Sequence, residues 1–439
     1  MNARTIQLAV VLAIAAGAAL PRHAVAQIPN PSTAALAMAE NFTAAARGYS
    51  AVAWNPAGLG MADNPGFSFT FGTIAAIAGL GPLTVMELAD YAGQEVPFET
   101  RREWLDRIKR ASGETGRAGS HVTGLALQAG PVAFQVGTTL AISANLAPGI
   151  AELIMFGNAD QDGTPREIDL SRSRLDVTAY TTGAASIGLP IAETAAGRLA
   201  LGVTGKYTMG HVLVRGIEST GMASADPLEL RLEFPIIHTH FGNDEDEEFE
   251  IRGGTGFGLD VGIGYETPEL TLAATIRNLF NNFEWDPQTL RFRDGSLLFD
   301  SERQDSDLEE RYFSEAPPAL ARVVNDLRFA PVLAAGARYL VQDGLLVTGD
   351  VRFATSDSEM DPVPRLHIGG GAEYRPISFI PLRAGVALIS LGEGDSGWQV
   401  GGGIGINLPV LDLMVSAMRR STTSSLDTVF QLTILGRKG

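Results

Sequence analysis

The sequence predicts an all-β protein: a closed antiparallel transmembrane β-barrel of about 14 strands with an N-terminal plug in its lumen. Three observations lead to this prediction. Apolar residues alternate with small or polar ones along many segments, the connections between these segments alternate between short and long, and the chain opens with an export signal. Glycine is frequent, at 50 of 439 residues, and is scattered through the alternating segments. Such scattering is typical of strands whose backbones approach other atoms closely.

The first 26 residues have the features of a secretory signal peptide. Arg4 supplies the positive charge, an apolar run extends from Ile6 to Leu20, and Ala24 to Ala26 forms a small-x-small cleavage site. The apolar run is about 15 residues long, shorter than the roughly 20 that a membrane-spanning helix needs. The chain has no cysteine, so no disulfide holds it together. We therefore expect an exported mature chain that starts at Gln27 and is not a helical membrane protein.

The charge balance excludes one class of partner. The formal net charge is −17, and loss of Arg4 and Arg22 with the signal makes it −19. A strongly negative surface repels the phosphate backbone, so we expect no nucleic-acid partner.

Alternation with a period of two residues is the dominant signal from residue 67 onward. In residues 199–207, for example, Leu201, Val203 and Tyr207 lie on one face, opposite Gly202, Thr204 and Lys206. The predicted strands are 67–78, 121–128, 131–143, 173–187, 198–214, 249–265, 269–279, 328–340, 344–354, 364–375, 381–390, 397–408, 410–419 and 427–436.

The connections support a barrel in the outer membrane. Short ones, such as 129–130 and 266–268, alternate with longer ones, such as 79–120 and 280–327. Outer-membrane barrels have short periplasmic turns and long extracellular loops, whereas a soluble sandwich has no reason to sort its loops in this way. We therefore expect the cell outer membrane of a Gram-negative-type bacterium as the location and outer-membrane lipid as a partner.

Three tyrosines fit the same orientation. Tyr265, Tyr339 and Tyr374 fall on the apolar face, one or two residues before a short turn. In a barrel they would belong to the periplasmic aromatic girdle. The alternative is that they pack in a soluble core.

The opposite face carries charged residues, which in a barrel point into the lumen. They are Lys206, Asp260, Arg277, Arg338, Asp350, Arg352, Glu373 and Arg383, together with His367. Charges of both signs that face one another across a lumen favour structural ion pairs. The alternative is that one arginine contacts the carboxylate of a substrate.

Something has to occupy the bore. Barrels of 8 strands are filled by side chains and those of 16 to 18 leave a channel, so about 14 strands lie between these cases. Many inward positions are small and leave space for a plug: Gly258, Gly262, Gly264, Ala273, Gly369, Gly371, Gly401, Gly403 and Gly405. Residues 27–66 are the sizeable mature segment outside the strand scheme, so we expect them to lie inside.

A motif in this segment connects the chain with a known group of proteins. Residues 48–59 read GYSAVAWNPAGL, follow an alanine-rich run through Arg47, and precede the alternating residues 67–71. This stretch, above all the WNPAGL core at 54–59, resembles the N-terminal signature of the long-chain fatty-acid transporter (FadL-like) superfamily.

The resemblance implies a division into a signal peptide at 1–26, a hatch at 27–66 and a barrel with long extracellular loops at 67–439. It also implies an outer-membrane channel for passive uptake of hydrophobic compounds such as long-chain fatty acids, with a hydrophobic small molecule as ligand. The superfamily also includes PorV-like barrels. The alternative is therefore a non-conducting barrel that acts as an adaptor for protein secretion or surface binding, with a protein partner at its extracellular loops.

The hatch prediction centres on Trp54, Asn55, Pro56 and Ala57. Proline lacks a backbone donor and keeps the preceding asparagine out of the helical region, so the chain turns here and leaves polar groups to bond the wall. Two interpretations stay open: a gate, or a turn that leads into the first strand.

The loops contain two further patterns. Residues 99–111 predict an amphipathic helix over the extracellular mouth, with Trp104, Leu105 and Ile108 on one face. It either caps the rim or receives an apolar ligand. The acidic run at 243–250 does not have the spacing of an EF-hand loop, and His238 and His240 have no further histidine nearby. We expect no metal and no cofactor.

Enzyme signatures are missing. The sequence contains neither G-x-S-x-G nor H-E-x-x-H. We therefore expect no catalytic residues and a protein that is not an enzyme.

Overall fold

The computed structural model describes residues 30–158, 164–216, 219–225, 229–240, 253–299, 304–325, 327–355, 364–392, 395–408, 411–422 and 426–438. The predicted signal peptide and the acidic run at 243–250 lie outside these residues. Within them, no helix has the length and apolar character that a membrane-spanning helix requires.

Fourteen antiparallel strands form a closed barrel, as predicted. Each pairs with its neighbours along the chain, and the first pairs with the last through a register that runs from Ser68↔Lys438 to Leu80↔Leu426. The strands are β1 (Phe67–Gly81), β2 (Glu114–Ala129), β3 (Val132–Leu146), β5 (Arg174–Thr194), β6 (Gly197–Gly216), β10 (Gly254–Glu266), β11 (Leu270–Asn281), β17 (Val332–Gln342), β18 (Leu345–Ala354), β19 (Leu366–Ile377), β20 (Ile380–Gly392), β21 (Asp395–Asn407), β22 (Asp412–Thr422) and β23 (Leu426–Lys438).

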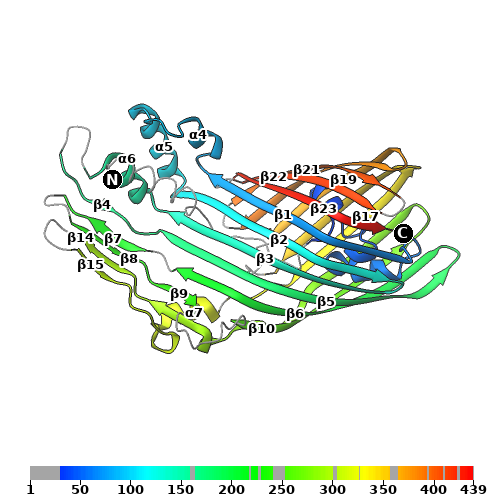
Figure 1. The fold of residues 1–439 in the computed structure, drawn as a ribbon. Helices are drawn as coiled ribbons and strands as arrows, with labels where there is room; N and C mark the ends of the chain where they lie inside the picture. Colours follow the sequence, from blue (N-terminus) through cyan, green and yellow to red (C-terminus); the bar gives the residue numbers. More distant parts are fainter. Residues whose placement is uncertain are drawn as a thin grey trace.

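The two ends of the barrel differ (Figure 1). At the turn end, adjacent strands are joined by tight turns, such as Gly130–Pro131 between β2 and β3. At the loop end, long connections carry helices and a second sheet. The predicted strict alternation of loop lengths is wrong on the last strands, because β20 ends at Gly392 and β21 already begins at Asp395.

Two strands depart from the predicted pattern for identifiable reasons. β2 begins at Glu114 instead of residue 121, because its first residues are polar or small and do not alternate with apolar ones. β1 contains a kink at Gly72, whose φ is 65° and which is skipped between the pairs Phe71↔Leu125 and Thr73↔Thr123. The left-handed region favours glycine, which has no Cβ. The kink moves the buried face of β1 from even to odd positions.

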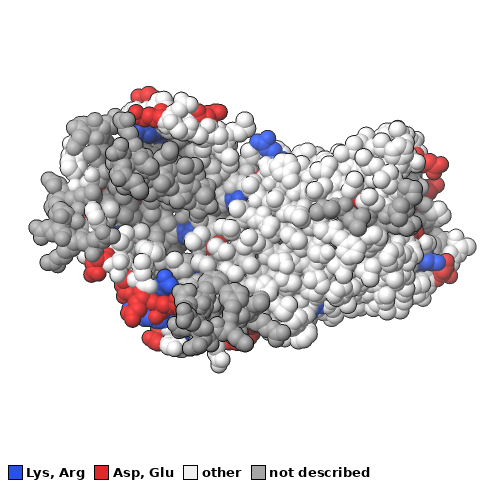
Figure 2. Space-filling view, viewed as in Figure 1, with Lys and Arg blue, Asp and Glu red and all other residues white. Residues whose placement is uncertain are grey.

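The outer face of the wall is apolar. Figure 2 shows an outer surface that is mostly uncharged along the wall, with charged residues gathered towards the two ends. The exposed apolar residues include Phe71, Val203, Ile263, Val351 and Leu432. Tyr339 and Tyr374 are 43% and 47% exposed near the turn end, while the hydroxyl of Tyr265 donates a hydrogen bond to Ala196 O at 3.1 Å. Hydrocarbon around a closed sheet requires such an apolar exterior.

The N-terminal segment lies inside the turn-end half of the barrel (Figure 1). It contains α2 (Thr33–Ala37), η1 (Gly48–Ser50), α3 (Ala51–Trp54) and η2 (Pro56–Gly60). Glycines of the barrel wall allow the backbone of this segment, which we call the plug, to approach closely at two places. A Cβ added to Gly202 would lie 2.2 Å from Pro56 C, and one added to Gly385 would lie 2.2 Å from Met38 C. Any larger residue at either position would collide with plug backbone, so the wall is shaped to this plug.

Helices cover one side of the loop end. They are α4 (Val85–Asp90), α5 (Phe98–Arg110) and α6 (Pro148–Phe156). Trp104, Leu105 and Ile108 of α5 are buried against Leu83 and Ala151. This confirms the helix predicted at 99–111, and its apolar face packs on the rim.

The other side of the loop end carries further strands. One five-stranded sheet contains β4 (Ile168–Asp169), β7 (Thr220–Ala223), β8 (Leu230–Glu233), β14 (Ser296–Phe299) and β15 (Gln304–Asp307). The wall is extended by β9 (Ile236–Thr239), β12 (Glu284–Trp285), β13 (Leu290–Arg293) and β16 (Arg311–Tyr312), with η3 (Pro287–Thr289), η4 (Phe313–Glu315) and α7 (Pro318–Asn325) beside them. Apolar side chains of β9, β12, β13, η4 and α7 form one buried cluster with Tyr180 and Leu213 of the barrel.

Candidate functional site

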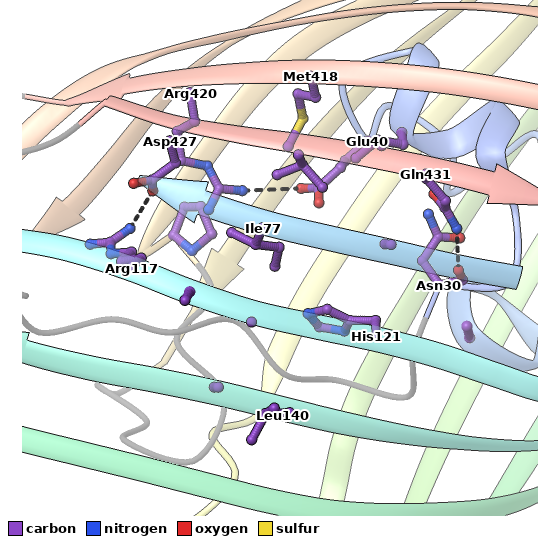
Figure 3. A pocket seen from close by; sticks show the side chains of 18 of the residues that line it. Asn30, Glu40, Ile77, Arg117, His121, Leu140, Met418, Arg420, Asp427 and Gln431 are labelled. Carbon is purple, nitrogen blue, oxygen red and sulfur yellow. Dashed lines mark hydrogen bonds and ion pairs between the residues drawn. The ribbon is translucent and has the colours of Figure 1, made fainter. Parts of the chain in front are cut away.

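A cavity of about 110 Å³ lies between the plug and the loop-end half of the wall. We call it the loop-end cavity (Figure 3). The plug contributes Asn30, Leu36, Glu40, Ala53 and Trp54, and strands β1, β2, β3, β11, β18, β22 and β23 contribute the remaining lining together with Pro364. Much of this lining is apolar, including Ala75, Ile77, Met418 and Val429. The cavity therefore suits an apolar molecule with a polar end.

Charged side chains occupy one part of this cavity. Arg117 pairs with Asp427 at 2.6 Å, and Glu40 accepts from Arg352 at 3.0 Å. Arg420 lies 3.9 Å from the same carboxylate of Glu40. With Arg277 also in the lining, arginines outnumber carboxylates among the described lining residues. The cavity therefore has a surplus of positive charge that an anionic group would neutralise.

A buried hydrogen-bond network connects Glu40 with the wall. Arg352 Nη2 lies 2.8 Å from His367 Nδ1, and His367 Nε2 lies 3.1 Å from Asn41 Oδ1. Because a guanidinium only donates, His367 Nδ1 is the acceptor and Nε2 carries the proton that is donated to Asn41. Asn41 then donates its amide to Val386 O at 3.2 Å. The network ties residues 40 and 41 of the plug to strands β18, β19 and β20.

The backbone at this point of the plug is strained. Ala39 and Glu40 have φ of 48° and 64°, in the left-handed region that non-glycine residues rarely adopt. The surrounding contacts hold this conformation. Gln399 donates to Ala39 O at 2.8 Å, and Thr348 donates to Asn41 O at 2.8 Å.

Trp54 is the predicted hatch residue that reaches the cavity. It is 5% exposed, and its ring centroid lies 5.5 Å from the guanidinium carbon of Arg352 and 5.7 Å from that of Arg277. Its indole N–H donates to Asn30 Oδ1 at 3.0 Å. The ring faces two cations and stabilises them through cation–π interactions.

The next three predicted residues anchor the plug. Asn55 has extended φ and ψ of −154° and 107°, and its Oδ1 caps η2 by accepting from Ala57 N at 3.0 Å. Its amide donates to Ile263 O and Ala274 O at 3.4 and 3.3 Å. Pro56 is the first residue of η2, and Ala57 is fully buried against the wall. This part of the motif forms a wedge fixed to β5, β6 and β10.

Three of the predicted charged residues hold the structure together elsewhere. Lys206 pairs with Asp260 at 2.6 Å, and Asp260 accepts from Asn278 N at 2.7 Å where the pairing of β10 and β11 is interrupted. Asp350 accepts from the backbone N–H groups of Phe42 and Thr43, each at 2.8 Å. These contacts leave Lys206, Asp260 and Asp350 outside the lining of the loop-end cavity.

The remaining predicted charges gather around a second cavity of about 120 Å³ at the turn end. Glu373 accepts from Arg383 at 2.6 Å and from Arg375 at 2.8 Å. Arg338 pairs with Asp63 at 2.8 Å. We call this space the turn-end cavity.

Several cavity residues were not predicted from the sequence. Glu40, Arg117, Arg420 and Asp427 supply most of the charge in the loop-end cavity. Arg117 falls in a segment that was assigned to a loop, and Arg420 falls one residue beyond the predicted end of its strand. A signal was present for Glu40, the single acidic residue between positions 30 and 60, because a lone acid in an apolar buried segment needs a cationic partner.

The comparison with protein families gives a membership. The model of a family of unknown function, DUF5723, matches residues 76–327, more than half of the chain. The chain belongs to this family. A comparison with curated proteins found no match.

Solved structures share the fold. The Ralstonia pickettii toluene transporter TbuX has a TM-score of 0.52 at 13% identity over 94% of this chain and 99% of that one. The P. putida toluene transporter TodX has a TM-score of 0.50 at 12% identity over 94% and 99% of the two chains. The CymD monoaromatic hydrocarbon channel has a TM-score of 0.50 at 12% identity over 95% and 99%. The predicted resemblance to FadL-like transporter barrels is thereby confirmed at the level of the fold.

Proposed function

We propose that this DUF5723 protein is an outer-membrane channel for passive uptake of hydrophobic compounds, and that compounds with an acidic end, such as long-chain fatty acids, are preferred. In this proposal the loop end faces outward and the turn end faces the periplasm. Residues 1–26 direct export, residues 27–66 form the hatch and residues 67–439 form the barrel.

The loop-end cavity is the observation that carries the proposal. It combines an apolar wall, formed by residues such as Ile77 and Val429, with four arginines against two carboxylates. An apolar chain gains free energy when it leaves water for such a wall, and a carboxylate would gain charge-assisted hydrogen bonds from guanidinium groups. A water-filled pore would offer an apolar compound neither contact.

The plug supplies the barrier that such a channel requires. It is fixed to the wall at η2 and again around α2, and it lies directly beneath the loop-end cavity. Passage then requires movement of the plug. Ala39 and Glu40, whose left-handed backbone conformation stores strain, lie where the plug meets the cavity.

The experiment is uptake of radiolabelled oleate by cells that carry or lack the protein, with two variants on one strand. Ala75 is 6% exposed and lines the loop-end cavity, whereas its neighbour Ala76 is exposed on the outer face. We expect Ala75→Phe to fill the cavity and reduce uptake at least several-fold, and Ala76→Phe to leave uptake unchanged. Equal uptake with and without the protein, for oleate and for toluene, would contradict the proposal and favour a non-conducting adaptor.

A further inference from the structure

The turn-end cavity lies on the opposite side of the plug from the loop-end cavity, and one short helix separates them. Leu36 of α2, and Glu40 just beyond its end, line the loop-end cavity. Ala34 of α2, and Met38 directly after it, line the turn-end cavity. The segment 34–40 therefore forms the partition between two cavities of similar volume.

The turn-end cavity has the composition of a ligand site. Met38, Phe42, Leu346 and Met414 give it an apolar wall. Polar groups from Tyr49 and Asn407 also line it. An apolar enclosure with a few convergent polar groups is the usual form of a small-molecule site.

Its electrostatics differ from those of the loop-end cavity. Each arginine in its lining has a carboxylate partner: Arg375 and Arg383 pair with Glu373, Arg338 pairs with Asp63, and Arg47 pairs with Glu266 at 2.9 Å. Asp412 also lines the cavity. The four guanidinium groups are therefore matched by four carboxylates, those of Asp63, Glu266, Glu373 and Asp412, and the cavity offers no surplus charge to a carboxylate.

One buried acceptor in this cavity is unused. Asn407 Oδ1 has no hydrogen-bond partner among the described residues. A buried acceptor without a partner costs free energy, and a ligand that donates a hydrogen bond to it removes that cost. The polar end that fits here is therefore a donor, such as an alcohol or an undissociated acid, and not a carboxylate.

We propose that the turn-end cavity is a second binding site, which receives the hydrophobic compound after it has passed α2 and holds its polar end as a hydrogen-bond donor to Asn407. The proposal rests on the proposed uptake function. It adds that the two sites differ in what they select: the loop-end cavity accepts an anionic end, and the turn-end cavity accepts a neutral donor.

The test uses dodecanol with a diazirine in its chain, photo-crosslinked to the full-length barrel in lipid vesicles, with the labelled peptides identified by mass spectrometry. We expect labelling near Met414 as well as near Ala75. Met414 is inward-facing and 9% exposed, whereas Leu413 is outward-facing and 42% exposed. Met414→Trp should abolish the labelling at the turn-end cavity and leave that at the loop-end cavity, and Leu413→Trp should change neither.

A smaller substitution guards against misfolding of the tryptophan variant. Asn407→Leu removes the acceptor and should weaken competition by unlabelled dodecanol at the turn-end cavity about three- to tenfold, while competition by dodecane stays unchanged. Labelling near Ala75 alone in the parent protein, or turn-end labelling that survives Met414→Trp and is indifferent to Asn407→Leu, would overturn the second site. Neither result would affect the proposed function, which fails separately if no lumenal peptide is labelled.

Discussion

Arg352 of strand β18 donates a hydrogen bond to Glu40 of the plug, with 3.0 Å between Nη2 and Oε2. The two residues are 312 positions apart in the sequence. Both side chains are largely buried, and Arg420 lies 3.9 Å from the same carboxylate oxygen. This contact therefore joins the plug to the wall through charge at the floor of the loop-end cavity.

The first prediction removes that charge. Glu40→Gln keeps the shape of the side chain but leaves Arg352 and Arg420 without their carboxylate. Breaking a buried ion pair by removing one partner typically costs about 3–5 kcal/mol. Here that cost destabilises the plug in its position inside the barrel. We expect a higher frequency of open events in planar-bilayer current recordings.

An exposed ion pair provides the control. Glu193 pairs with Arg198 at 2.8 Å, and its side chain is 63% exposed. Exposed pairs contribute about 0–1 kcal/mol, so Glu193→Gln should give recordings like those of the parent protein. If Glu40→Gln opens no more often than the parent protein, this contact does not hold the plug in place.

The second prediction concerns the seat of η2. A Cβ at Gly202 would meet Pro56 C at 2.2 Å and Ala57 N at 2.4 Å, whereas a Cβ at Gly205, on the same strand, would meet nothing within 4 Å. Gly202→Ala should force the wedge from its seat, at a cost of about 1–3 kcal/mol, and raise ion conductance. Gly205→Ala should not.

Deletion of residues 27–60 gives the largest ion conductance expected in that experiment. It should leave a folded barrel with a larger nonspecific conductance than Gly202→Ala. If both the deletion and Gly202→Ala conduct like the parent protein, the plug is not the barrier to ions.

The strands were predictable because apolar alternation is a local pattern. The plug was predictable because small inward-facing residues leave space that another segment has to fill. Alternation places Gly262 and Gly264 on the inward face, and their small size indicates that something fills the space beside them. In the structure a Cβ at Gly262 would lie 2.0 Å from Asn55 Oδ1. The sequence therefore predicted both partners of this contact, although not that they touch each other.

The pairing within the cavities was not predictable. Which carboxylate neutralises Arg352 depends on how the plug crosses the lumen and on where the barrel closes, and neither is encoded locally. The start of β2 was missed for a related reason. Arg117 faces the lumen, where polar residues are tolerated, and Glu114 is buried as the acceptor of a hydrogen bond from Leu83 N at 3.3 Å. The apolar alternation that marks a strand therefore stops before the strand does.

The third prediction separates two roles of Trp54. Trp54→Phe loses the hydrogen bond to Asn30 but keeps an aromatic face between Arg277 and Arg352, so we expect uptake of oleate close to that of the parent protein. Trp54→Ala removes a buried ring and leaves a void, at a cost of about 3–5 kcal/mol. Limited proteolysis of the plug should then be faster for Trp54→Ala alone. Equal protection of both variants would mean that the ring does not stabilise the plug.

The fourth prediction concerns pH at the loop end, where α4 and α5 are joined through Glu87. Hydrogen bonds from Arg107, and then from Thr84, lower the pKa of Glu87 to about 2 against the opposing effect of burial. Arg107 Nη2 donates to Glu87 Oε2 at 3.1 Å, and Thr84 N donates to the same oxygen at 2.8 Å. Because the folded pKa lies below the ordinary value of about 4.3, this contact stabilises α4 above pH ~4 and is lost as the pH falls towards 2.

A spin label reports that loss. The chain has no cysteine, so Met86→Cys, on an exposed position of α4, takes a single label. We expect its mobility to rise between pH 4 and pH 2, and to be high already at neutral pH when Glu87→Gln is added. A label at Arg102→Cys on α5, whose apolar face is buried against the rim, should remain ordered throughout. An α4 label that is equally ordered at neutral pH with and without Glu87→Gln would show that the apolar contacts of α4, and not this carboxylate, fix it to the rim.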